Sequence, residues 1–172
     1  MILQPVAKSS PSLRQWRWGL TRWYNGFSPQ ERIRGWQVSH WLQAIDYLPR
    51  PKQCEVCGGQ SGVSYHNENY YTPWLPYSLC KSCHYVIHNR HRLPEKLPAL
   101  LRQHGAGRGG WLRHVLAGDF ENLAAEVRAR EGTQRAYIEN HLPDNLNTVF
   151  PKHQLYPLAT DHFTAGEPHS DR

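Results

Sequence analysis

The four cysteines of this chain have a spacing that predicts metal binding. Cys54 and Cys57 form one CxxC pair, and Cys80 and Cys83 form a second pair after an interval of 22 residues. Each pair makes a tight turn that directs two sulfurs toward one centre, and two such turns supply the tetrahedral all-sulfur shell that Zn²⁺ accepts. Because four thiolates would leave no position for water, we expect this zinc ion to be structural rather than catalytic.

Histidines between and after these cysteines are the candidates for catalysis. His66 is expected on or just after a short strand, while His84 and His88 share a face if a helix begins after Cys83. His91 could lie on that side too. Because a zinc clip would tie the strand to the helix, these imidazoles could converge on a second, open metal site suited to hydrolysis. The alternative is that they are surface residues or donors to the zinc thiolates.

The segment that carries these residues resembles the HNH nucleases, the ββα-metal class. The stretch HNENYYTPWLPYSLCKSCHYVIH is similar to a phage and bacterial HNH-like pattern, which runs His-His-Glu-Asp-Tyr, two residues, Pro, and then Leu-Cys-x2-Cys-His-x3-His. The likeness covers the segment from 52 to 92 and leaves the flanking helices unexplained. The positions in register are His66, Glu68, Tyr70, Pro73, Leu79, Cys80, Cys83, His84 and His88.

The resemblance implies a role for each position of the pattern. It implies that His66 and His84 bind a catalytic divalent ion, Mg²⁺ or another, and that residue 67 is the general base that activates water. This chain has Asn67 there, and an amide cannot take a proton from water at neutral pH, where general-base catalysis contributes typically about 10²–10⁴-fold. The acidic position two residues further on is also an amide, Asn69.

Three alternatives follow from the amide at position 67. His66 could be the base, which would put Tyr65 at the ligand position. Glu68 or His88 could act as the base from a neighbouring position. The site could instead be a degenerate nuclease that only binds. The catalytic candidates are therefore His66, Asn67, His84 and His88.

The charge of the chain favours a polyanionic partner. Lys and Arg number 20 against 14 acidic residues, which gives a formal net charge of +6, and most of these cations are Arg. Arg binds phosphate in a bidentate manner, so nucleic acid, and DNA in particular, is the expected partner. The candidate phosphate contacts are Arg14, Arg17, Arg90 and Arg92.

The sequence predicts no membrane segment. No apolar run approaches the roughly 20 residues of a membrane span. The first residues, MILQPVAKSSPSL, lack the charged start and long apolar region of a signal peptide. We therefore expect a cytoplasmic protein, in which disulfides are disfavoured and doubled CxxC pairs bind metal.

Helix signals flank the metal segment. Leu and Trp residues with interleaved Arg predict a basic amphipathic helix over residues 12–27. Ser28 as the cap, Pro29 and Glu31 predict the start of a second helix, which the prolines after position 48 end. His40 in this helix is interpreted as a core histidine rather than a ligand. The stretch GAGRGG at 105–110 is interpreted as a linker.

These patterns together predict an α+β protein: a small zinc-stapled ββα-metal (HNH-like) core flanked by helices. The resemblance implies an HNH-like endonuclease that hydrolyses DNA phosphodiesters. The rivals are a non-catalytic zinc-binding DNA-binding or adaptor module, and a protein-interaction module that uses the Trp-rich helices. The expected regions are an aromatic, Arg-rich helical region (1–51), the zinc-bound core (52–93), a helical region (94–141), and a mostly irregular or disordered tail (142–172).

Overall fold

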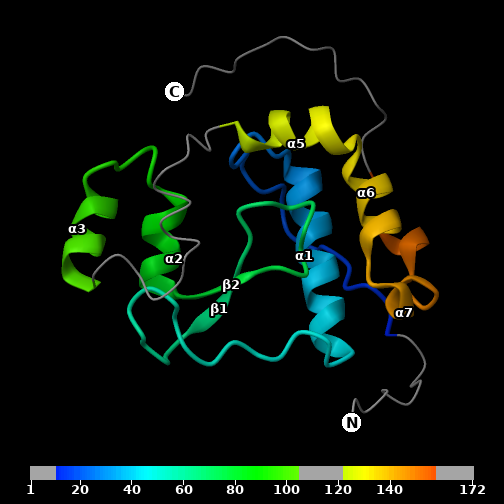
Figure 1. The fold of residues 1–172 in the computed structure, drawn as a ribbon, viewed down its shortest axis with the longest axis horizontal. Coiled ribbons are helices and arrows are strands. Elements are labelled where there is room, and N and C mark those ends of the chain that lie inside the picture. Colours follow the sequence, from blue (N-terminus) through cyan, green and yellow to red (C-terminus); the bar gives the residue numbers. More distant parts are fainter. Residues whose placement is uncertain (1–10, 105–121, 158–172) are drawn as a thin grey trace.

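A small hairpin surrounded by helices forms the fold (Figure 1). The structure is a computed structural model, which describes residues 11–104 and 122–157. The two-stranded hairpin, followed by a helix and flanked by other helices, confirms the expected α+β class. The elements in chain order are α1 (Pro29–Ala44), β1 (Val63–His66), β2 (Tyr77–Cys80), α2 (Lys81–His88), α3 (Lys96–His104), α5 (Leu123–Glu131), α6 (Gln134–His141), α7 (Asp144–Asn147) and a 3₁₀-helix (Lys152–Gln154).

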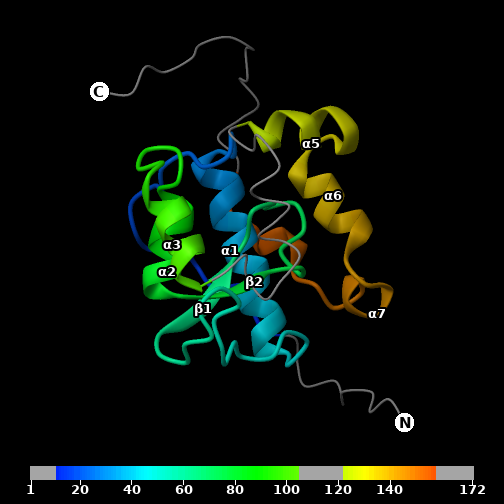
Figure 2. The same cartoon turned by 60° about the vertical axis from the view of Figure 1, so that its left-hand side comes forward.

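Helix α1 lies between α2 and α6 in both views of the fold (Figures 1 and 2). The predicted capping box at its start is confirmed. The Ser28 hydroxyl accepts a hydrogen bond from the backbone N–H of Glu31 at 3.3 Å, and the Glu31 carboxylate accepts one from the backbone N–H of Ser28 at 2.8 Å. This reciprocal pair satisfies two backbone donors that a helix start otherwise leaves without partners.

The segment before α1 is not helical, so the predicted amphipathic helix over residues 12–27 is wrong. Residues 11–23 form no regular element, and a turn with positive φ at Asn25 and Gly26 leads into α1. The backbone of this segment bonds to distant side chains instead of to itself. Gln154 accepts from the N–H of Leu13 at 2.7 Å, and Gln37 donates to the carbonyl of Arg14 at 2.9 Å. These long-range bonds satisfy two backbone groups of the segment without a helix.

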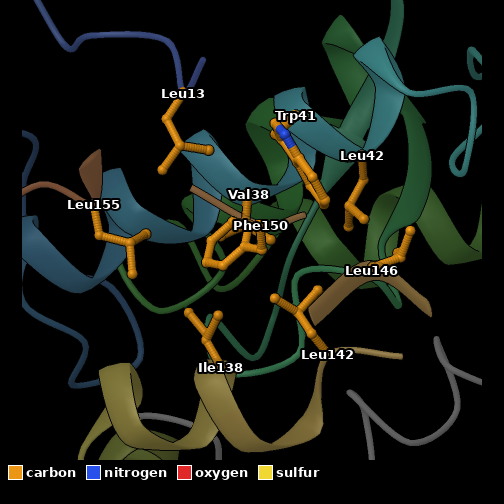
Figure 3. Close-up of a cluster of buried hydrophobic side chains, with 9 residues drawn as sticks. All are labelled: Leu13, Val38, Trp41, Leu42, Ile138, Leu142, Leu146, Phe150 and Leu155. Carbon is orange, nitrogen blue, oxygen red and sulfur yellow. The ribbon is translucent and has the colours of Figure 1, made fainter. Parts of the chain in front are cut away.

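The largest core cluster joins α1 to the C-terminal elements (Figure 3). Phe150 and Leu155 belong to it, although the sequence places both in a mostly irregular tail. Residues 142–157 therefore include short helices and core side chains, whereas the rest of the tail lies outside the described residues. The buried members of this cluster are Leu13, Val38, Trp41, Leu42, Ile138, Leu142, Leu146, Phe150 and Leu155.

The hairpin is antiparallel, with a register that pairs Val63 with Cys80 and His66 with Tyr77. The long connection between its strands packs against α1. Ser39 in α1 donates to the carbonyl of Pro73 at 3.1 Å. A Cβ on Gly35 would lie only 2.8 Å from the Tyr70 ring, so this helix position requires glycine. The contacts fix the strand end at His66 relative to α1.

Some sequence predictions concern residues that the structure does not describe. The glycine-rich stretch at 105–110 and the tail after residue 157 lie outside the described residues. The division into four regions stays a prediction. Of the helices that the structure describes, none combines the length and apolar character needed to cross a membrane.

Candidate metal centres

The first centre is the cysteine cluster formed by Cys54, Cys57, Cys80 and Cys83. All four sulfurs lie within 4.8 Å of one another, and none is in a disulfide. Tetrahedral coordination with Zn–S distances of about 2.3 Å requires sulfur–sulfur distances of about 3.8 Å. The sulfurs of Cys57 and Cys80 are 3.7 Å apart, which fits this requirement. The cluster therefore suggests a structural Zn²⁺ site.

Backbone bonds shape the first turn of the cysteine cluster and attach it to the hairpin. The N–H of Gly59 points to the sulfur of Cys57 at 3.4 Å. The N–H of Glu55 donates to the carbonyl of Ser78 at 2.8 Å, and the Glu55 carboxylate accepts from the N–H of Ser78 at 2.6 Å. This reciprocal pair joins the turn to β2, so both CxxC turns are held at one end of the hairpin.

The environment of Cys54 favours a thiolate. Burial alone raises the pKa of its thiol, but backbone N–H groups at Cys57, Cys80 and Val56 outweigh this effect and lower the pKa to about 7. Hydrogen bonds to the charged form stabilise that form. Since only the thiolate binds zinc, this lowering of the pKa assists metal binding at Cys54. Burial raises the pKa of Cys57 and Cys83 in the same cluster, so ionisation of these two thiols depends on the charge of the bound ion.

The second centre is the histidine cluster formed by His66, His84 and His88. One nitrogen of each ring lies within 4.8 Å of the others. His66 is at the end of β1, and its ring centroid is 5.0 Å from that of His84 and 4.9 Å from that of His88. The two helical rings are 4.6 Å apart. The predicted convergence of these three histidines is therefore confirmed.

A carboxylate fixes the orientation of the His66 ring. Its Nε2 lies 2.7 Å from an oxygen of Glu68. A carboxylate only accepts, so Nε2 carries the proton and donates. In the neutral ring Nδ1 then carries a lone pair, and this buried atom has no partner in the described part of the chain. A metal-binding imidazole with its other nitrogen on a carboxylate has the same arrangement.

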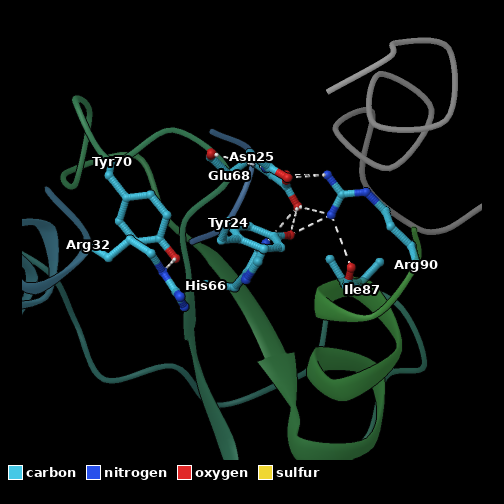
Figure 4. Close-up of polar contacts among 8 residues, drawn as sticks. All are labelled: Tyr24, Asn25, Arg32, His66, Glu68, Tyr70, Ile87 and Arg90. Carbon is cyan, nitrogen blue, oxygen red and sulfur yellow. Dashed lines mark hydrogen bonds and ion pairs between the residues drawn. The ribbon is translucent and has the colours of Figure 1, made fainter. Parts of the chain in front are cut away.

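The Glu68 carboxylate is buried and accepts several further hydrogen bonds (Figure 4). Arg90 donates to it at 2.9 and 3.1 Å, Asn25 at 2.6 Å and Tyr24 at 3.1 Å. Burial alone would raise the pKa of Glu68, but the bond from His66 and the charge of Arg90 outweigh it and lower the pKa to about 2. Since every bond favours the ionised form, Glu68 is a positioning group and a poor base.

The position of Arg90 argues against the predicted phosphate contact. Its side chain is only 5% exposed, and besides Glu68 it donates to the carbonyl of Ile87 at 3.0 Å, near the end of α2. Because both terminal nitrogens of this guanidinium bond to groups inside the protein, they are not available to an external phosphate. Arg90 therefore links Glu68 to helix α2 and supports the histidine cluster from behind.

The two helical imidazoles are held in the neutral form. Burial is the largest cause, and the neighbouring His66 and the charge of Arg32 add to it. Together they lower the pKa of His84 to about 4. The same causes, with His84 itself, lower the pKa of His88 to about 2. Neutral imidazole is the form that binds metal ions, so the donor set fits a divalent ion.

A main cleft of about 710 Å³ opens over the histidine cluster. Its wall includes Arg32, Trp36 and His40 from α1, Arg50 from the segment after α1, and Trp16. Among the described residues that line this cleft there is no Asp or Glu. The cleft therefore suits an anionic ligand.

Asn67 also lines the main cleft and is held against α1. Its amide nitrogen donates to the hydroxyl of Ser39 at 3.3 Å, whereas its buried carbonyl oxygen has no partner among the described residues. The side chain is thus next to His66 but offers no group that accepts a proton. None of these observations assigns it a catalytic role.

The remaining predicted phosphate contacts are not among the described residues that line the main cleft. Arg14 and Arg17 are exposed and line a side hollow of about 510 Å³, on whose wall Trp36 also lies. Arg92 is exposed and donates to Asn89 at 2.7 Å. The arrangement leaves their roles as predictions.

Sequence reasoning missed the stripe of α1 that faces the main cleft. Arg32, Trp36 and His40 are spaced four residues apart, so they share one side of the helix. The interpretation of His40 is right in that its Nδ1 is hydrogen-bonded within α1 and it lies outside the clustered ligands, but the residue is only half-buried and lines the cleft rather than the core. The spacing of four residues was the available signal. Ile33, Gln37 and Trp41 have the same spacing, and the sequence alone does not tell which of the two stripes is buried.

Comparison with known proteins gives no family for this chain. No family model, no curated protein and no solved structure matches it.

Proposed function

We propose that this protein is an HNH-like endonuclease that hydrolyses DNA phosphodiesters with a divalent metal ion. The observation that carries the proposal is the convergence of His66, His84 and His88 at a cleft whose described lining contains arginines and no carboxylate. A site of this kind presents metal ligands, an open approach and a positive surface together. These are the requirements for metal-assisted attack on a phosphodiester.

The order of the elements supports the resemblance to the ββα-metal class. The hairpin of β1 and β2 leads directly into α2, with His66 on the first strand and the other two histidines on the helix. The cysteine cluster closes the opposite end of the same hairpin. This arrangement is what a zinc-stapled ββα-metal core requires.

Each group near the cleft has a proposed part in the reaction. A bound divalent ion would polarise the scissile phosphate and stabilise the leaving oxygen. His66, His84 and His88 would hold this ion, and Glu68 keeps the His66 ring in the orientation that leaves Nδ1 free. Arg32 and Arg50 would contact the phosphate oxygens, since guanidinium matches phosphate geometry.

His40 is the candidate for the base that Asn67 cannot supply. Its Nδ1 lies 2.9 Å from the backbone carbonyl of Trp36, and a carbonyl only accepts, so Nδ1 carries the proton. The neutral ring then presents a lone pair on Nε2, within the wall of the main cleft. Burial lowers the pKa of His40 below its ordinary value of 6.5, so the ring is ready to accept a proton at pH 7.

Asn67 favours a second candidate function, a zinc-binding DNA-binding module without catalysis. The residue stands where the resemblance implies a base, and its amide is fixed on Ser39. A chain that lost its base could keep the cleft and its arginines for binding alone.

Plasmid nicking with Mg²⁺, Mn²⁺ or Ni²⁺ distinguishes the two functions. We expect the native protein to nick, and His84→Gln to lose nicking while it keeps one zinc per chain by elemental analysis. The matched control is His153→Gln, an exposed histidine far from the cluster in sequence, which should nick normally. Zinc content must be measured in every chelator sample, because a chelator can also empty the cysteine cluster. Native protein that binds DNA but nicks with none of these ions would support the non-catalytic module.

A further inference from the structure

Three tryptophans, Trp16, Trp18 and Trp36, form a cluster that lines the main cleft and the side hollow. Their ring centroids are 4.8 Å apart for Trp16 and Trp18, 5.1 Å for Trp16 and Trp36, and 5.8 Å for Trp18 and Trp36, all in edge-to-face arrangements. Trp18 is nevertheless 64% exposed, and Leu20, two residues further along the chain, is 59% exposed. Large apolar side chains that stay in solvent at one place mark a binding surface rather than a core.

The tryptophan cluster is held in place although its segment has no regular structure. Leu13 is buried in the main core, and Gln37 bonds the carbonyl of Arg14. The indole N–H of Trp16 donates to the carbonyl of Gly19 at 3.1 Å. Further along, Arg32 bonds the carbonyl of Arg22. Because the chain is anchored on both sides, the exposed rings are arranged before any ligand arrives, which lowers the entropic cost of binding.

Trp36 lies between the histidine cluster and the exposed arginines of the side hollow. It lines both the main cleft, where the histidine cluster lies, and the side hollow, where Arg14, Arg17 and Trp18 lie. Trp16 lines the main cleft as well. A ligand that passes from the histidines to the exposed arginines would therefore contact these rings.

The charges along this path identify the chemistry of the ligand. Among the described residues that line the main cleft or the side hollow, the charged side chains are arginines and none is Asp or Glu. The path thus combines cationic and flat aromatic groups. A nucleic-acid strand has the complementary combination, with an anionic phosphate and a flat base in every nucleotide.

We propose that the tryptophan cluster stacks unpaired bases of a strand bound along the main cleft, so that the preferred ligand is single-stranded or locally unpaired nucleic acid. Base faces inside a duplex are covered by their neighbours, and a ring can stack on a base only where the strand is open. Arg14 and Arg17 hold the backbone of the flanking nucleotides. The inference rests on the proposed function only in taking nucleic acid as the ligand, because it does not require cleavage.

An abasic strand separates stacking from charge. A fluorescein-labelled oligo(dT) and an abasic strand of equal length carry the same phosphates, and fluorescence anisotropy without added divalent ion measures the affinity of the full chain for each. We expect the native protein to bind oligo(dT) more tightly by about 5–150-fold, the range for stacking of one base on an aromatic side chain. The duplex of the same length should bind more weakly than oligo(dT).

The variants test whether the tryptophan cluster is the cause. Trp18→Ala should lose most of the preference for oligo(dT) over the abasic strand, and Trp18→Phe should keep most of it. Trp23→Ala is the matched control, since Trp23 is 55% exposed and lines neither hollow, and its preference should equal that of the native chain. Arg17→Gln should weaken binding of both strands equally.

Three results would overturn the inference: equal native affinity for the two strands, an undiminished preference in Trp18→Ala, or tighter binding to the duplex. The outcome is independent of the nuclease proposal. A chain that nicks DNA without the preference contradicts only the stacking inference, and a chain that has the preference without nicking contradicts only the nuclease.

Discussion

The cysteine cluster and the histidine cluster arise from the same hairpin and helix but have opposite surroundings. Cys54 and Cys83 are buried in an apolar group with Leu79 and Ile87. The histidine cluster instead faces the main cleft and is supported by the ionised Glu68. One set of ligands is enclosed by hydrocarbon, and the other combines an open face with a polar support.

Helix α2 explains how one element serves both clusters. Cys83 and Ile87 are four residues apart and buried on one face, while His84 and His88 form the next stripe and line the cleft. The buried stripe and the cleft-facing stripe of α2 are therefore offset by one residue along the sequence. The comparison teaches that ligand number and surroundings act together: four thiolates enclosed by apolar side chains complete a zinc shell, whereas three imidazoles that face a cleft leave a coordination position open.

The largest effect should come from opening the cysteine cluster. Cys80→Ser removes a thiolate, and structural zinc in small domains contributes apparent binding energies on the order of 10–16 kcal/mol. We expect loss of the zinc and unfolding of the hairpin and α2. Elemental analysis and amide hydrogen exchange measure the two effects. In His84→Gln the zinc and the exchange protection should both remain, and loss of either would contradict the division between the clusters.

The second effect concerns the polar support of the histidine cluster. Glu68→Gln leaves the Arg90 guanidinium buried without a counter-charge, and breaking a buried ion pair in this way costs about 3–5 kcal/mol. Urea unfolding of the zinc-loaded protein measures the free energy. The matched control is Glu139→Gln, which removes the exposed pair with Arg135 and should cost about 0–1 kcal/mol. Equal costs for the two variants would mean that the Glu68 network contributes no special stability.

The features that sequence predicted correctly depend on short spacings. The CxxC pairs, the interval between His84 and His88, and the capping box at Ser28 each involve residues within one turn of chain. Local geometry alone then brings the side chains together. The convergence of His66 with the helical histidines needed one further assumption, that the zinc clip joins the strand to the helix.

The features that sequence missed depend on distant partners. Arg90 looked like a phosphate contact because its partner Glu68 lies 22 positions away, in the connection between the strands. The failed helix over 12–27 is explained by Gln37 and Gln154, which satisfy backbone groups of that segment across the core. Local pattern cannot reveal such bonds, since tertiary contacts override helical periodicity.

The third effect tests the missing base of the histidine cluster. Asn67→His should raise the nicking rate by about 10²-fold on the general-base scale. His40→Gln should lower the native rate by a similar factor if His40 acts as the base. Single-turnover kinetics measures both rates.

The pH profile of nicking provides a second measurement of the same prediction. A histidine base works in its neutral form. Burial and the charge of Arg14 lower the pKa of His40 below 6.5, although its hydrogen bond to the Trp36 carbonyl acts in the opposite direction. The native rate should therefore fall with decreasing pH only below 6.5, and Asn67→His should be less sensitive to His40→Gln. An unchanged rate in His40→Gln would exclude His40 as the base.

The smallest effect compares the charges on the two sides of the molecule. Arg50 is exposed in the wall of the main cleft, whereas Arg102 is exposed on α3, which packs against the cysteine cluster. On duplex DNA each neutralised phosphate contributes about −0.9 to the slope of log affinity against log salt concentration. Arg50→Gln should therefore make the slope shallower by about one unit, and Arg102→Gln should leave it unchanged. Fluorescence anisotropy over a salt series measures both variants.

If Arg102→Gln changed the slope as much as Arg50→Gln, the side of the cysteine cluster would also bind DNA. In that case the difference between the two clusters would not be accompanied by a difference in DNA binding between the surfaces around them.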